Sequence, residues 1–196
     1  MSKMAIFIDG GYVYHILKDN FGIDNYSVDY EKFVKWISSD STILRTYYYD
    51  CLPYQSPKPT QKESKFLSKK QKYFLYLERL PRFCVRQGKL VYRGNDDKGK
   101  GIFIQKRVDL LLGLDLGSLV STHKVDEVAI ITGDSDFIPV VEFAKREGVI
   151  VWLIHGPLCT YHRDLWQATD ERKEITQNVI NNIILQPANN NEKTAI

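Results

Sequence analysis

Residues 127–154, EVAIITGDSDFIPVVEFAKREGVIVWLI, have the pattern that is most informative about the architecture. It begins with the apolar run 127–131, passes through Thr-Gly-Asp-Ser-Asp and continues into a helical pattern over 136–147. Gly148 stands where glycine commonly follows a helix C-terminus, and 149–154 is a second apolar run. Continuous apolar strands around an amphipathic helix are typical of a parallel sheet whose two faces are both covered.

The rest of the chain repeats this alternation. The apolar and periodic segments predict strands at 4–9, 43–51 and 83–92, and helices at 12–21, 29–38, 62–79, 105–121 and within 162–185. The turn-rich segment 94–101 lies between two β-like runs and predicts a hairpin. We expect one α/β domain over residues 1–185 with a mainly parallel sheet, followed by a disordered tail at 186–196.

Composition limits the class of protein. The chain has 196 residues and 43% hydrophobic content, which suits one domain with a sizeable core. No apolar run reaches the roughly 18–20 residues of a membrane span, and the N-terminus does not resemble a signal peptide, so we expect a cytoplasmic protein with no membrane partner. The three cysteines are widely spaced, which favours buried free thiols over zinc ligands or disulfides.

Four aspartates stand out by their positions. Asp9 ends the first predicted strand, and Asp134 and Asp136 follow the strand at 127–131. Ligands of parallel sheets bind at the carboxyl ends of the strands, so these acids share one edge if the two strands are neighbours. Asp109 lies beside core leucines in a predicted helix, where aspartate is slightly disfavoured and therefore invites a functional explanation.

Crowded carboxylates of this kind suit a hard divalent cation such as Mg²⁺ or Mn²⁺. Such ions can neutralise a phosphodiester, orient it and activate water for its hydrolysis. The four aspartates therefore predict a metal-dependent site that cuts nucleic acid. Lys106, one helical turn before Asp109, would contact phosphate or pair with Asp109.

Each acid also has a simpler interpretation. Asp9 could only cap the helix that follows it, and either Asp134 or Asp136 could cap the next one. Asp109 could be a solvated polar position. Asp115 lies six residues further on, about 120° around the helix, and should therefore point away from Asp109.

Basic residues offer a path for the nucleic acid. Net charge is only +3, but residues 55–72 contain six lysines against one glutamate. Lys69, Lys70, Lys72 and Arg107 are the candidate contacts with nucleic acid, because a carboxylate cluster repels phosphate unless cations offset it. A solvated helix face is the alternative interpretation of the lysine run.

Three segments together resemble a known family. FIDGGYVY (7–14), KRVDLLLGLD (106–115) and ITGDSDFIPVVEFAKREGVIVWLI (131–154) resemble the signature blocks of the NYN domain, and most closely its LabA-like branch within the PIN-like nuclease superfamily. The resemblance implies a three-layer α/β/α sandwich with a mainly parallel sheet of roughly five strands. It also implies a metal-dependent ribonuclease.

The resemblance assigns roles to individual residues. Asp9 corresponds to the metal ligand of the first strand, Asp109 to the helix acid, and Asp134 and Asp136 to the acids after the strand at 127–131. Thr132 and Ser135 stand where a hydroxyl supports these ligands or a bound water. One departure concerns Tyr12, because many relatives read Asp-Gly-x-Asn where this chain has Asp9-Gly10-Gly11-Tyr12.

Two functions follow as hypotheses. The first is a metal-dependent ribonuclease, an endoribonuclease acting on single-stranded RNA with Mg²⁺ or Mn²⁺. The second is a catalytically weak or inactive RNA-binding or regulatory module of the same fold, which the change at Tyr12 favours. A phosphatase is disfavoured, because no Asp-x-Asp-x-Thr/Val motif follows the first strand. A homodimer stays open, since no heptad or interface helix indicates one.

Overall fold

The computed structural model describes residues 1–99 and 101–185 of the chain. Within these residues, six parallel strands form one sheet in the order β3-β2-β1-β6-β7-β8. The strands are β1 (Lys3–Asp9), β2 (Thr42–Asp50), β3 (Phe83–Gln87), β6 (Glu127–Ile131), β7 (Ile150–His155) and β8 (Glu171–Glu174). The predicted α/β class with a parallel sheet is confirmed, and the tail predicted at 186–196 lies outside the described residues.

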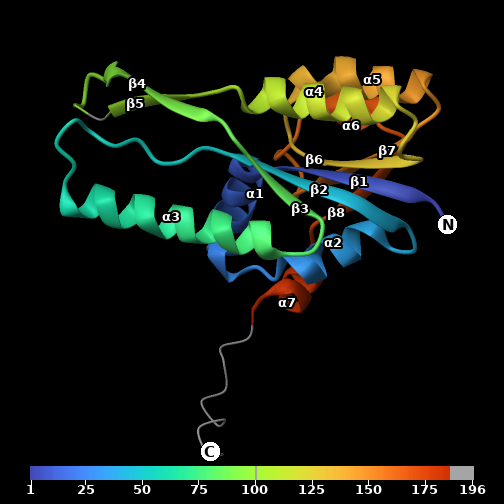
Figure 1. Ribbon diagram of the computed structural model, residues 1–196, viewed down its shortest axis with the longest axis horizontal. Coiled ribbons are helices and arrows are strands. Elements are labelled where there is room, and N and C mark those ends of the chain that lie inside the picture. Colours follow the sequence, from blue (N-terminus) through green and yellow to red (C-terminus); the bar gives the residue numbers. More distant parts are fainter. Residues whose placement is uncertain (100, 186–196) are drawn as a thin grey trace, which may run out of the picture.

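Helices cover both faces of this sheet, which makes three layers (Figure 1). One face carries α1 (Gly10–His15), α2 (Tyr30–Ser38), α3 (Gln61–Arg79) and α7 (Gln177–Ile183). The other carries α4 (Val108–Ser121), α5 (Ile138–Arg146) and α6 (Arg163–Ala168). A π-helical turn, Ile16–Asn20, continues α1, and 3-10 turns occur at Asn25–Ser27 and Ser135–Phe137.

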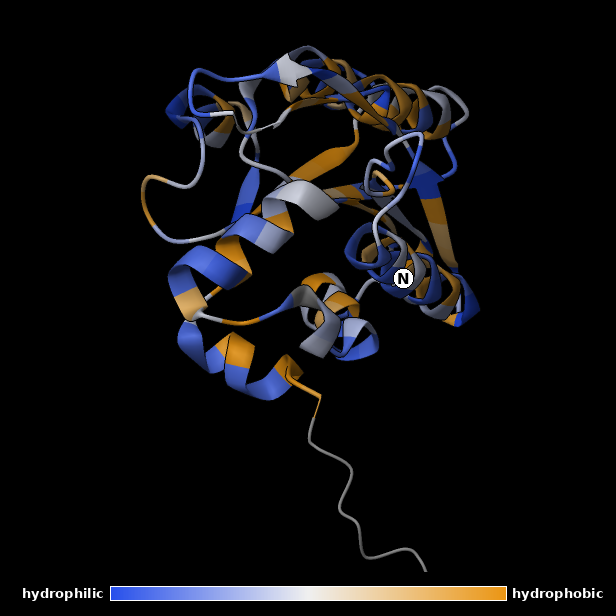
Figure 2. Ribbon diagram, turned by 90° about the vertical axis from the view of Figure 1, so that its left-hand side faces the viewer, coloured by the Kyte–Doolittle hydropathy of each residue, from blue (hydrophilic) through white to orange (hydrophobic). Residues whose placement is uncertain are grey.

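Strand β1 shows why both faces are needed. Met4, Ile6 and Ile8 point into the core beneath α2 and α3, whereas Ala5 and Phe7 point into the core beneath α4 and α5. All five are fully buried or nearly so. Side chains of a strand alternate between faces, so a continuous apolar run must be covered twice. Figure 2 shows the hydrophobic central strands between helices that carry both hydrophilic and hydrophobic residues.

The order of the strands places a switch point between β1 and β6. Strands β2 and β3 lie on one side of β1, and β6, β7 and β8 lie on the other. Strands β1 and β6 are neighbours, which is the condition for the acids that follow them to share one edge, and their register pairs Ile8 with Ile131. Open α/β sheets bind ligands at the carboxyl ends of the strands beside such a switch point. Asp9 and Thr132 stand at this point.

A two-stranded antiparallel ribbon extends beyond the sheet (Figure 1). It consists of β4 (Lys89–Asn95) and β5 (Gly101–Lys106). The hairpin predicted around 94–101 is therefore confirmed. The strand predicted at 83–92 is wrong as one element, because it is divided at Gly88. A Cβ atom there would come within 2.8 Å of the Lys106 carbonyl and 2.9 Å of the Cys51 Sγ.

Several local predictions need correction. Helix α4 begins at Val108 rather than at 105, so Lys106 ends β5 and does not lie one helical turn before Asp109. The helical spacing of Phe66, Tyr73 and Leu77 within 62–79 predicts that all three face the core, but Phe66 has 54% of its surface exposed. Cys51 is buried and Cys84 half-buried, but Cys159 is exposed.

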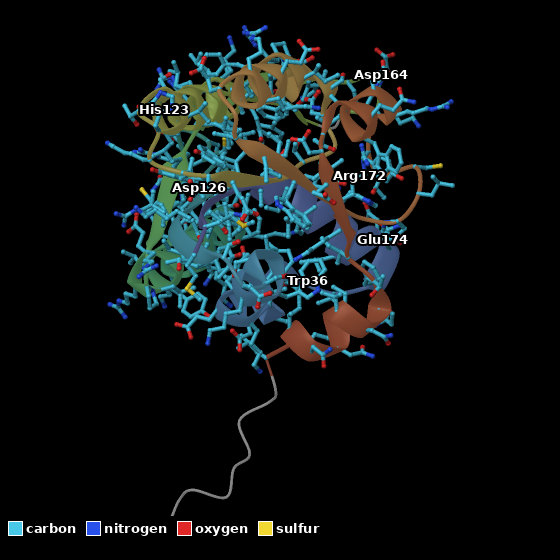
Figure 3. All side chains as sticks on the ribbon, turned by 90° about the vertical axis from the view of Figure 1, so that its right-hand side faces the viewer. Trp36, His123, Asp126, Asp164, Arg172 and Glu174 are labelled. Carbon is cyan, nitrogen blue, oxygen red and sulfur yellow. The ribbon has the colours of Figure 1, made fainter. Side chains whose placement is uncertain are left out.

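The sheet has six strands rather than about five, because β8 was not predicted. Its sequence, Glu-Arg-Lys-Glu, has no apolar run. It forms the edge of the sheet, where Arg172 and Glu174 lie on the strand (Figure 3) and Arg172 stacks over Trp166 at 4.0 Å. Charged residues are common on edge strands because they oppose pairing with another chain. No helix in the described part of the chain is long and apolar enough to cross a membrane.

Candidate functional site

Asp9 is the last residue of β1 and also the cap of α1. One carboxylate oxygen, Oδ1, accepts hydrogen bonds from the N–H groups of Gly11 (2.9 Å) and Tyr12 (3.1 Å). The other, Oδ2, lies 3.4 Å from the Thr132 hydroxyl. Capping and a role in the site are therefore compatible, because each uses a different oxygen.

Thr132 links Asp9 to the acids that follow β6. It is fully buried, and its hydroxyl can donate to Asp9 while accepting from the N–H of Asp134 at 3.3 Å. Asp134 in turn caps the 3-10 turn, with Oδ1 accepting from the N–H of Asp136 at 2.9 Å. Ser135 is half-buried within that turn. The Thr132 hydroxyl therefore connects the end of β1, at Asp9, with the segment that follows β6, at Asp134.

Three of the four predicted acids line one cleft. Asp9, Asp109 and Asp134 share its wall with Tyr12 and Thr132, and its volume is about 420 Å³. We call this the acid cleft. Asp109 is exposed in the first turn of α4. Asp136 is not part of the wall.

The acids act on one another electrostatically. Burial first, and then the negative charges of Asp109 and Asp50, raise the pKa of Asp9 from 3.8 to about 6, against the hydrogen bonds from Tyr12 and Gly11. Burial, followed by the charges of Asp134 and Asp136, raises the pKa of Asp109. Asp136 therefore belongs to the same charge cluster although it does not line the cleft. Such raised pKa values are common where carboxylates are gathered for function.

The donor atoms suit hard divalent cations such as Mg²⁺ or Mn²⁺. Carboxylates and a threonine hydroxyl are hard oxygen donors, which these ions prefer. Among residues 1–99 and 101–185, no group of three or more acidic, histidine or cysteine side chains lies close enough together to hold a metal ion. Mg²⁺ in proteins commonly uses one or two carboxylates and keeps several waters. The acid cleft fits this open mode of binding, not a closed protein cage.

Comparison with known proteins identifies the family of the chain. The family profile of the NYN domain matches residues 3–172, from β1 to the edge strand β8. The chain belongs to the NYN domain family. This family is part of the PIN-like nuclease superfamily, and NYN nucleases generally depend on a divalent metal. The predicted family is therefore confirmed.

A solved structure of similar fold supports the architecture of this NYN domain. A protein of unknown function from Vibrio parahaemolyticus has 21% sequence identity and a TM-score of 0.65, over 94% of this chain and 96% of that one. Acinetobacter baumannii MurG has 13% identity and a TM-score of 0.38, over 90% of this chain and 42% of that one, and supports no conclusion. No curated protein matches the chain.

Tyr12 forms part of the wall of the acid cleft in this NYN domain. Its hydroxyl accepts a hydrogen bond from the N–H of Gly156 at 3.2 Å and lies 3.4 Å from the Thr160 hydroxyl. Its ring lies against Gly133, where an added Cβ would come within 2.6 Å of the ring. Tyr12 thus ties the end of β1 to the loop after β7. Its side chain supplies no carboxamide to the acid cleft.

Asp50 lies near the acids of the site but was not predicted from the sequence. It ends β2 beside β1, its Oδ1 accepts from the N–H of Cys51 at 2.7 Å, and its Oδ2 forms an ion pair with Lys70. Its charge contributes to the raised pKa of Asp9. An available signal was that Asp50 ends an apolar strand in the same way as Asp9 does.

The predicted nucleic-acid contacts occupy different environments. Lys70 is nearly buried against Asp50, and Lys69 pairs with Asp24 at 3.3 Å. Lys72 is exposed, as is Arg107, which has a left-handed backbone (φ 77°) at the start of α4. A role of these four residues in binding nucleic acid stays a prediction.

Asp115 does not join the acids of the NYN domain. Its carboxylate accepts from Arg86 at 2.9 and 3.0 Å and from the Tyr49 hydroxyl at 2.9 Å. These contacts join α4 to β2 and β3, so Asp115 has a structural partner for each oxygen.

Proposed function

We propose that this NYN domain is an endoribonuclease that depends on Mg²⁺ or Mn²⁺ and hydrolyses phosphodiesters within an RNA strand. The observation that carries the proposal is the acid cleft, which Asp9, Asp109 and Asp134 line beside the switch point of the sheet. Asp136 adds its charge to the same cluster. An RNA substrate agrees with the cytoplasmic location that the sequence predicts.

The residues of the cleft would have different roles in holding a metal ion. Asp9 and Asp134 each use one oxygen in a backbone hydrogen bond, which holds the carboxylate in place and leaves the second oxygen for a metal ion. Thr132 orients Asp9. A bound divalent ion would supply neutralisation of the phosphodiester charge and activation of the attacking water.

Asp109 is an exposed carboxylate of the cleft, and burial together with the charges of Asp134 and Asp136 raises its pKa, which favours it as a proton acceptor. We therefore assign it the removal of a proton from the attacking water, or a share in holding metal. Lys106 and Ser135 have supporting roles in the proposal, because both flank these acids in the chain.

One observation favours the second candidate function, an RNA-binding module without turnover. Tyr12 occupies the wall of the acid cleft in place of an amide and is held there by Gly156 and Thr160. The four acids nevertheless remain, so we place the nuclease first.

Cleavage of labelled single-stranded RNA in Mg²⁺ or Mn²⁺ tests the proposal. Asp9→Asn and Asp134→Asn should each lower the rate by at least about 100-fold, as expected when a charged group of a catalytic site is lost. Asp164→Asn is the matched control, because Asp164 is exposed on α6 and lies outside the cleft. Cutting that survives both cleft substitutions would disprove this site. RNA binding without cutting by the wild type would favour the second function.

A further inference from the structure

A second cavity of about 370 Å³ adjoins the acid cleft. The two share three wall residues, Gly11, His15 and Gln105, so they lie next to each other. Beyond this shared wall the cavity is lined by aromatic rings from three elements, Tyr14 of α1, Tyr26 of the first 3-10 turn and Phe66 of α3. We call it the aromatic groove.

The charged groups in the aromatic groove neutralise one another. Lys69 pairs with Asp24, and its ammonium lies 3.8 Å from the centre of the Tyr26 ring. Lys70 pairs with Asp50. Two cations and two anions therefore leave no excess charge in the wall. A groove of rings with balanced charges suits a planar, uncharged group such as a nucleic-acid base better than a free phosphate.

Phe66 is not needed by the hydrophobic core. Helix α3 packs on the sheet through Tyr73, Phe74 and Leu77, which are buried, whereas Phe66 is 54% exposed at the groove. In the free protein, this large ring beside a candidate catalytic cleft exposes apolar surface to water, which is unfavourable. It becomes useful when a second planar group covers it.

Lysine side chains of α3 lie beside the rings, where they could contact the phosphate groups of RNA. Lys62 and Lys65 lie one helical turn before Phe66 and Lys69, on the same side of α3. Both are exposed, and neither forms an ion pair within the described residues. Single-strand-binding proteins combine the same two features, rings that stack on bases and cations that follow the backbone.

The rings continue along the ribbon, which favours a chain of nucleotides over a single one. Leu90 of β4 lines the groove, and Tyr92 lies on the same face of that strand two residues further on. Tyr92 stacks on Tyr54 at 5.6 Å, and Phe103 contacts both rings. These side chains extend the line of rings away from the acid cleft.

We propose that the aromatic groove binds an unpaired base of single-stranded RNA next to the phosphodiester held in the acid cleft, with Phe66 stacking on that base. Bases in a duplex are already stacked and paired, so the groove would select single strands. The inference rests on the proposed function, because the acid cleft defines where the phosphodiester lies.

Binding measured without metal separates this inference from cleavage. Fluorescence anisotropy of a labelled single-stranded RNA in EDTA reports affinity while metal-dependent cutting is stopped. Phe66→Ala should weaken binding about ten-fold, which lies within the cost of losing one base–aromatic stack. Leu75→Ala is the matched control, because Leu75 is also 54% exposed but lies nine residues on, on the opposite side of α3. It should bind as the wild type does.

Two further ligands sharpen the test. A blunt RNA duplex should bind the wild type and Phe66→Ala equally, and adenosine monophosphate should compete with the labelled strand far more weakly than an unlabelled strand. Unchanged thermal unfolding of Phe66→Ala would show that the loss is local.

The outcomes distinguish the two proposals. Equal affinity of Phe66→Ala and Leu75→Ala for the single strand overturns the base-binding groove, even if the wild type cuts RNA in Mn²⁺. Failure of the wild type to bind RNA overturns it as well. Binding that depends on Phe66, in a protein that never cuts, supports the groove and overturns the nuclease.

Discussion

Replacing Asp9 with asparagine tests the electrostatics of the acid cleft most directly. Burial and the charges of Asp109 and Asp50 raise the pKa of Asp9 from 3.8 to about 6. An acid with a higher pKa in the folded state destabilises that state once it is ionised. At about 1.4 kcal/mol per pKa unit, charged Asp9 lowers the free energy of unfolding by about 3 kcal/mol above pH 6.

The pH dependence of this effect has a defined sign. Below the unfolded pKa of 3.8 the side chain is neutral in both states and the penalty is absent. It grows as pH rises through the window from 3.8 to about 6 and is complete above it. Without metal, Asp9→Asn should therefore be more stable than the wild type by about 3 kcal/mol at pH 8 and by about half of that at pH 5.

Asparagine is a fair replacement, because its oxygen can still accept from the N–H groups of Gly11 and Tyr12. Urea denaturation in EDTA between pH 5 and pH 8 measures the difference, with Asp164→Asn as the control. Mg²⁺ or Mn²⁺ should then stabilise the wild type and have little effect on Asp9→Asn, since binding to the folded state raises its stability. A variant that is no more stable than the wild type at pH 8, with a difference that does not change with pH, would refute the reasoning.

Two other substitutions test the surroundings of the site by urea denaturation. Lys70→Ala leaves the carboxylate of Asp50 buried without its cation, and should cost about 3–5 kcal/mol; a loss below about 1 kcal/mol would mean that the pair is solvated. Gly10→Ala places a Cβ atom 2.7 Å from the ring of Tyr48 and should cost about 1–3 kcal/mol. Gly113→Ala, in α4 with nothing within 4 Å, should instead stabilise by about 0.5–1 kcal/mol. Equal effects of the two glycine substitutions would contradict the close contact at Tyr48.

The central strands could be predicted because their apolar runs have one physical explanation. A strand buried on both faces cannot contain polar residues in its middle, and β1, β6 and β7 meet that condition. The edge strand β8 does not, because only one of its sides pairs with a neighbour and its residues are charged. Its strand conformation comes from the backbone of β7, which no local pattern in β8 reveals.

The candidate site shows the same division. The carboxyl ends of parallel strands meet at one edge, so positions after predicted strands were enough to bring Asp9 and Asp134 together. The partners of Lys69 and Lys70 are distant in the chain, at Asp24 and Asp50, and a run of lysines does not reveal such partners. The exposure of Phe66 could not be predicted for a related reason. Helical spacing does not distinguish a position that faces the core from one that faces a groove formed with other elements.

Asp9 explains why a cap and a candidate metal ligand are the same residue in this NYN domain. Helix α1 begins directly after β1, so its first N–H groups need an acceptor at the end of the strand. These bonds fix one oxygen and stabilise the charge, while burial and neighbouring acids oppose it. A substitution to alanine would remove the cap and the charge together, and its loss of activity could not be assigned to either. Asparagine keeps the acceptor and removes only the charge, so it separates the two roles of the residue.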